Sequence, residues 1–148
     1  MRRESYRGLE RRLASQNSRF ARYTQFRYAV ERAEYLERGG HSSVSLNSLA
    51  VTVSVLGYLL TYLDHTPPES IERVERAAGV TADRLTRDLI PVTLRAIARK
   101  LHDMTQAGID TQRAVTLDPY LARVRKALAG HSERRRLSEI PMSHALSA

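Results

Sequence analysis

A chain of 148 residues is long enough for one domain with a hydrophobic core and too short for two comfortable ones. Hydrophobic residues make up 42% of the chain and charged residues 27%, which are globular values that argue against wholesale disorder. The absence of cysteine excludes disulfides, zinc–thiolate sites and cysteine nucleophiles.

The net charge of +8 indicates an anionic partner. All but two of the 24 basic residues are arginine, which binds phosphate and carboxylate groups in bidentate geometry. Residues 1–38 carry a net charge of +5 and residues 109–148 a net charge of +3, whereas residues 39–66 carry −1. A surface that binds nucleic acid, or an anionic membrane face, is therefore expected at the two ends of the chain.

The periodicity of apolar residues predicts an all-α fold: a single helical bundle of about five helices, with no convincing strand. The helical domain is expected over residues 1–130, followed by a basic tail over residues 131–148. Its first part, residues 1–38, is predicted to be a basic amphipathic helix, with a polar patch near residue 16 that could divide it in two. Gly39 and Gly40 are predicted to end this helix.

Residues 42–63 are predicted to form the second and most hydrophobic helix, capped by Ser42 or Ser43. Its core, 44–63, is a central helix with two apolar faces. One face, which we call the leucine seam, follows alternating steps of three and four residues: Leu46, Leu49, Val53, Leu56, Leu60 and Leu63. The opposite face consists of Val44, Val51, Val55, Tyr58 and Tyr62. A helix apolar on two faces is expected inside a bundle or between subunits, so the leucine seam is predicted to mediate self-association.

The same stretch is also long enough to cross a bilayer, since no charged residue occurs between Gly39 and Leu63. Three serines, two threonines, one asparagine and one glycine within residues 44–63 make insertion marginal. The composition and spacing together favour a buried or interfacial helix, with a membrane span as the alternative.

Residues 67–107 are predicted to hold a helix-turn-helix-like pair followed by a kinked helix. Thr66 is expected to cap the first helix, which would end at Gly79, and Thr81 is expected to cap the second. Pro91 is expected to kink or restart the helix that follows.

The stretch SIERVERAAGVTADRLTR, residues 70–87, resembles the helix-turn-helix of DNA-binding proteins. Three residues depart from that pattern. Glu75 stands where a small residue usually packs, and Asp83 and Asp88 place negative charge on the helix that would meet phosphates. A plain helical corner within the bundle is therefore the alternative interpretation.

The last helix is predicted over residues 118–130, ending at Gly130, with Leu121, Val124 and Leu128 on its buried side. The stretch RFARYTQFRY, residues 19–28, alternates arginines with aromatic residues, as expected for stacking and phosphate contact. The alternative is an amphipathic helix that buries its aromatic side chains. The predicted nucleic-acid-binding residues all come from the two ends: Arg2, Arg3, Arg7, Arg11, Arg12, Arg19, Arg22, Arg27, Arg134, Arg135 and Arg136.

No arrangement of residues typical of an enzyme is found in the sequence. The five histidines show no HExxH motif, and there is no phosphate-binding glycine loop or nucleophile elbow. Asp64–His65 and His102–Asp103 place carboxylates beside imidazoles, but exposed helix ends are the default interpretation of such pairs. No catalytic residue, metal site or cofactor is therefore expected.

These observations predict a non-enzymatic, basic, self-associating nucleic-acid-binding or packaging subunit, such as a small viral or plasmid-encoded nucleoprotein or a DNA-binding regulator. Its expected partners are nucleic acid and further copies of the chain, in the cytoplasm or in a nucleoprotein or virion assembly. One alternative is a single-pass membrane-anchored protein with its span at residues 44–63. Another is a structural helical adaptor in a larger assembly.

Overall fold

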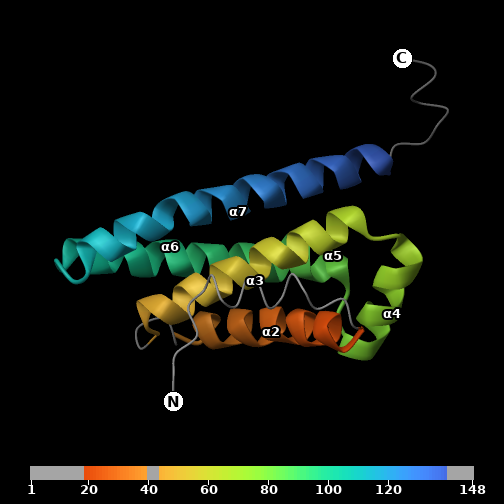
Figure 1. The fold of residues 1–148 in the computed structure, drawn as a ribbon, viewed down its shortest axis with the longest axis horizontal. Helices are drawn as coiled ribbons and strands as arrows, with labels where there is room; N and C mark the ends of the chain where they lie inside the picture. The colour runs from red at the N-terminus through yellow and green to blue at the C-terminus, as the bar shows by residue number, and fades with distance from the viewer. Residues whose placement is uncertain (1–18, 40–43, 140–148) are drawn as a thin grey trace.

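The computed structural model describes residues 19–39 and 44–139, and within these ranges it contains helices and no strand. The predicted all-α bundle is thereby confirmed. The elements in chain order are α2 (Arg19–Glu37), α3 (Leu46–His65), α4 (Pro68–Ala78), α5 (Ala82–Arg84), the π-helical turn η2 (Leu85–Leu89), α6 (Ile90–Gln106) and α7 (Thr111–Ser138). Figure 1 shows α3 crossing the bundle between α2 and α7, with α6 behind it.

The two helices that begin the described chain have clear terminal signals. After α2 ends at Glu37, Gly39 adopts a positive φ of 88°, as predicted for a glycine that ends a helix. Ser45 caps α3, because its side chain accepts a hydrogen bond from the Ser48 N–H at 3.2 Å. The predicted caps Ser42 and Ser43 lie outside the described residues, and α3 begins at Leu46 rather than at residue 42.

The leucine seam lies in the core of its own chain. Its six residues are each 8% exposed or less, in one apolar cluster with Phe26 of α2, Ile97 of α6 and Leu121 of α7. In the single chain their apolar surface is therefore largely covered by other helices, and self-association through the leucine seam stays a prediction. The opposite face is covered less completely: Val55 is buried beside Tyr28, Val51 and Tyr58 in a small separate cluster.

Among the described helices, α3 is the one long and apolar enough to cross a membrane. Eleven of its 20 residues are buried against other parts of the chain. Burial of this kind is typical of a core helix in a globular bundle, which is the interpretation that the composition and spacing of α3 already favoured.

The structure corrects the prediction for Thr66 and places a helical irregularity directly before Pro91. Pro67, not Thr66, is the N-cap of α4, and it makes no side-chain cap bond. At Pro91 the predicted irregularity takes the form of the π-helical turn η2, which ends where the Ile90 N–H donates to the Leu85 carbonyl, and α6 begins at Ile90. The wider turn accommodates the proline ring and its missing donor, so α5, η2 and α6 follow one another without a break.

The last helix is much longer than predicted. It spans Thr111–Ser138, so it includes Pro119 and continues through Gly130 into residues assigned to a basic tail. A glycine inside a helix costs about 1 kcal/mol relative to alanine. Here the helix beyond Gly130 is held by contacts of its own side chains, since His131 bonds Asp64 and Arg135 pairs with Asp83. Residues 140–148 of the predicted tail lie outside the described residues.

The burial of α3 predicts a large stability effect at Leu56. Leu56→Ala removes a fully buried side chain and is expected to lower the free energy of unfolding by about 2–5 kcal/mol. Leu137→Ala, at a position that is 53% exposed on α7, is the matched control and is expected to change it by less than about 0.5 kcal/mol. Urea denaturation measures both, and equal effects would contradict the packing described above.

Candidate nucleic-acid interface

The helix-turn-helix-like corner has the backbone geometry expected from its sequence. Gly79 ends α4 with a positive φ of 71°, which favours glycine, and its N–H donates to the Glu75 carbonyl at 2.8 Å. Val80 is buried, so it anchors the turn in the core. Thr81 caps α5, as predicted, by accepting from the Arg84 N–H at 3.0 Å. Since α2 contacts α4, η2 and α6, it packs against the elements on both sides of this corner.

Two acidic residues that depart from the helix-turn-helix pattern have partners within the chain. The Glu75 carboxylate accepts from the Ala82 N–H at 2.7 Å and so satisfies a donor at the start of the second helix. Asp83 pairs with Arg87 at 2.7 Å and with Arg135 at 2.9 Å. The charge of Asp83 is therefore compensated internally, whereas Glu75 keeps its charge and Asp88 remains exposed.

Three arginines around the corner are exposed and make no ion pair with any described residue. These corner arginines are Arg73 and Arg76 of α4 and Arg84 of α5. Arg76 and Arg84 line one surface hollow together with Thr81, Glu72 and Glu75. Glu72 and Arg76 stand four residues apart on α4 and form no ion pair, whereas Asp83–Arg87 and Glu34–Arg38, at the same spacing, do. None of the corner arginines was among the predicted binding residues.

The predicted binding arginines of α2 are engaged in packing. The Arg22 guanidinium lies 4.5 Å from the centre of the Tyr62 ring and donates to the Gln25 side chain at 3.1 Å. Burial raises the pKa of Tyr62, and the positive charge of Arg22 partly opposes that shift. Arg27 donates to the Ala78 carbonyl at 3.3 Å and so satisfies an acceptor at the C-terminus of α4. Both arginines therefore hold helices together.

Two aromatic residues of the 19–28 motif, Phe26 and Tyr28, are also used within the fold. Phe26 is fully buried and meets the Tyr62 ring edge-on, with the ring centres 6.4 Å apart. The Tyr28 hydroxyl is hydrogen-bonded to the Thr52 hydroxyl at 2.9 Å. This arrangement fits the amphipathic-helix alternative better than a stacking platform for bases. Arg19 begins α2, and its side chain lies outside the described set.

Each predicted arginine of the C-terminal end pairs with a carboxylate of the same chain. Arg134 meets Asp64 at 2.5 Å, and His131 bonds the other oxygen of that carboxylate at 2.7 Å. Arg135 meets Asp83, and it also pairs with Glu139 at 3.4 Å. Arg136 meets Glu133 at 2.6 Å, which lowers the pKa of Glu133 through the hydrogen bond and the charge. These arginines carry little uncompensated charge for phosphate.

The remaining predicted arginines, Arg2, Arg3, Arg7, Arg11 and Arg12, lie outside the described residues. Within residues 19–39 and 44–139, no group of three or more histidine, aspartate or glutamate side chains could hold a metal ion. Comparisons with protein-family models, curated proteins and solved structures found no match to this chain.

The contact between Asp64 and His131 predicts an energetic coupling between α3 and the end of α7. In a double-mutant cycle, Asp64→Ala and His131→Ala are expected to be non-additive by about 1 kcal/mol, because both side chains are mostly buried in one network. Asp64→Ala with Arg125→Ala is the control, since Arg125 is exposed and makes no contact with Asp64 that the structure describes. Additivity in both cycles, measured by urea denaturation, would contradict the anchoring of residues 131–138.

Proposed function

We propose that this chain is a non-enzymatic nucleic-acid-binding subunit that contacts the phosphate backbone through its helix-turn-helix-like corner. One observation carries the proposal: the three corner arginines are exposed without a carboxylate partner among the described residues, whereas Arg22, Arg27 and Arg134–Arg136 are engaged within the fold. Arginines without an internal partner are the ones free to release counterions from phosphates.

The geometry of the corner supports backbone contact rather than base readout. Arg73 and Arg76 lie on the first helix and Arg84 on the second, so their charges frame the turn from two sides. Contacts of this kind position a protein on nucleic acid without reading its sequence. Residues 1–18 add five arginines against two glutamates, and we propose that they supply further contacts of the same kind.

The proposed setting is a nucleoprotein assembly, in the cytoplasm or in a virion, with no subunit contact assigned to the leucine seam. The proposed affinity depends on salt concentration, because each phosphate that the protein neutralises releases counterions. For duplex DNA, each such contact makes the slope of log K against log salt concentration more negative by roughly 0.9. The same charges give no affinity for an uncharged polymer, which makes ionic strength the natural variable for testing the proposal.

The test is fluorescence anisotropy with a labelled mixed-sequence duplex DNA and a labelled single-stranded RNA over a range of salt concentrations. Arg76→Ala and Arg84→Ala are each expected to weaken binding several-fold and to reduce the salt slope by about one. Arg125→Ala removes the same charge from the exposed side of α7 and is the matched control, expected to have a smaller effect. A variant lacking residues 1–18 separates the contribution of the N-terminal arginines.

Binding that does not weaken with rising salt would contradict the proposal, as would the absence of binding to either nucleic acid. Equal losses for Arg84→Ala and Arg125→Ala would show a diffuse charge effect and not a site at the corner.

Glu72 provides a test in the opposite direction. It lines the same hollow as Arg76 and Arg84, and its side chain makes no hydrogen bond or ion pair with the residues that the structure describes. Glu72→Gln removes a negative charge that repels phosphate, so it is expected to tighten binding by a few-fold at low salt. Glu31→Gln, on the exposed side of α2, is the control. Weaker binding of Glu72→Gln would place the phosphate elsewhere.

A further inference from the structure

Two adjoining hollows follow the line where α3 and α7 pack side by side. The residues of the two helices meet in order, Asn47 with Arg113, Gly57 with Val124 and Asp64 with His131, so the helices run parallel. Asn47, Ser54, Gly57 and Thr61 of α3 face α7 with small or short side chains, and the space beside them is open on the outside. Tyr120 borders both hollows and joins them into one groove.

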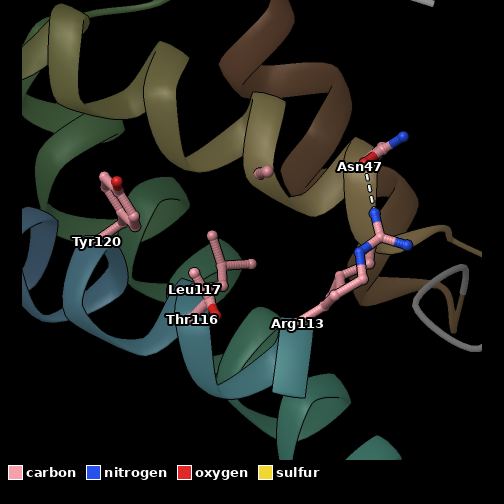
Figure 2. Close-up of a pocket in the computed structure, with 7 residues that line it drawn as sticks. Asn47, Arg113, Thr116, Leu117 and Tyr120 are labelled. Atoms are coloured by element: carbon pink, nitrogen blue, oxygen red, sulfur yellow. Dashed lines mark hydrogen bonds between the residues drawn. The ribbon is translucent and has the colours of Figure 1, made fainter. Parts of the chain in front are cut away.

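Figure 2 shows the first hollow, with Arg113 reaching from α7 to Asn47 on α3 and Tyr120 further along α7. The Arg113 guanidinium donates to the Asn47 side chain at 2.9 Å. The floor of this hollow is aliphatic and is formed by Leu46, Ala50 and Leu117. In the second hollow Val53 and Val124 continue the apolar floor, and Arg123 lies with its guanidinium 5.0 Å from the centre of the Tyr120 ring.

The charged side chains that line the groove are all positive. Arg113 borders the first hollow and Arg123 the second, and no carboxylate lines either of them. A guanidinium has five N–H donors, and the bond to Asn47 uses one donor of Arg113. An apolar floor with an arginine near each end is complementary to an amphipathic helix that has carboxylates at the borders of its apolar stripe. Tyrosine and arginine are also the residues enriched at the energetic centres of protein interfaces.

We propose that the α3–α7 groove binds an amphipathic, acidic helix of a partner protein, with its apolar stripe on Ala50, Leu117 and Tyr120 and its carboxylates on Arg113 and Arg123. A second copy of this chain placed symmetrically on the groove would bring these arginines against the same arginines, which is repulsive. The groove shares no residue with the corner hollow, so this inference stands independently of nucleic-acid binding. If the chain is a helical adaptor, this groove is the surface through which it would bind a partner.

The spacing of the two arginines sets the register of the partner. They are ten residues apart on one helix, which corresponds to about 15 Å along its axis. A partner helix lying along the groove is therefore expected to carry its two carboxylates roughly ten or eleven residues apart, on the same side, with apolar residues at three- and four-residue steps between them.

The test uses two synthetic helical peptides of about five turns, with the same leucine stripe and either glutamate or lysine at the two border positions. Each is titrated into the full chain by isothermal calorimetry. The glutamate peptide is expected to bind at least about tenfold more tightly than the lysine peptide. The double variant Arg113→Glu, Arg123→Glu is expected to reverse that preference, a gain that loss of folding cannot produce. Arg125→Glu is the control and is expected to leave the preference unchanged.

Equal binding of the two peptides, or no binding of the glutamate peptide up to about 1 mM, would overturn the proposal. Sedimentation equilibrium of the chain alone tests the competing occupant: dimerisation that the double charge reversal abolishes would assign the groove to a second copy. Peptide binding that persists when Ala50→Trp fills the floor of the first hollow would also overturn it, because the stripe would then lie elsewhere.

Discussion

The burial of α3 by helices of its own chain is the constraint on which the rest of the structure depends. Leu49, Leu56, Leu59 and Leu60 have no exposed surface, and they are held by α2, α6 and α7. The polar groups of α3 are also used internally, since Thr52 is fully buried and its hydroxyl meets both Tyr28 and Arg32. Because α3 forms the core of the chain, its hydrophobicity needs no bilayer or second subunit to explain it, and binding must be sought outside the leucine seam.

The sequence was sufficient to predict that α3 is a helix with two apolar faces, because periodicity reports directly which side chains share a face. It could not identify what covers those faces. The same spacing of Leu46, Leu49 and Val53 is produced by a subunit contact and by an internal core, and long-range packing decides between them. The helix after Gly130 was missed for a similar reason: glycine is a local stop signal, whereas Asp64 and Asp83, which hold the helix beyond it, are distant in the chain.

The candidate site was predicted less well than the fold, because net charge along a sequence does not show which arginines are paired. The arginine run at residues 134–136 is conspicuous in the sequence, yet each member meets a carboxylate. Arg73 and Arg84 belong to no run of basic residues in the sequence, yet they remain exposed at the corner. The one available signal was the corner motif itself, since a turn between two helices presents the residues beside it to solvent. Arg113 and Arg123 border a groove only because α3 lies beside α7, a contact that the sequence does not show.

Hydrogen exchange of the α3 amides, followed across a wide range of protein concentration in detergent-free solution, tests this account most directly. If α3 is the core of a single chain, the amides from Leu49 to Leu60 are among the slowest to exchange, and their protection is independent of concentration. Fast exchange in the dilute protein, with protection appearing only on self-association or on addition of lipid vesicles, would contradict it. That result would return α3 to a subunit interface or a membrane.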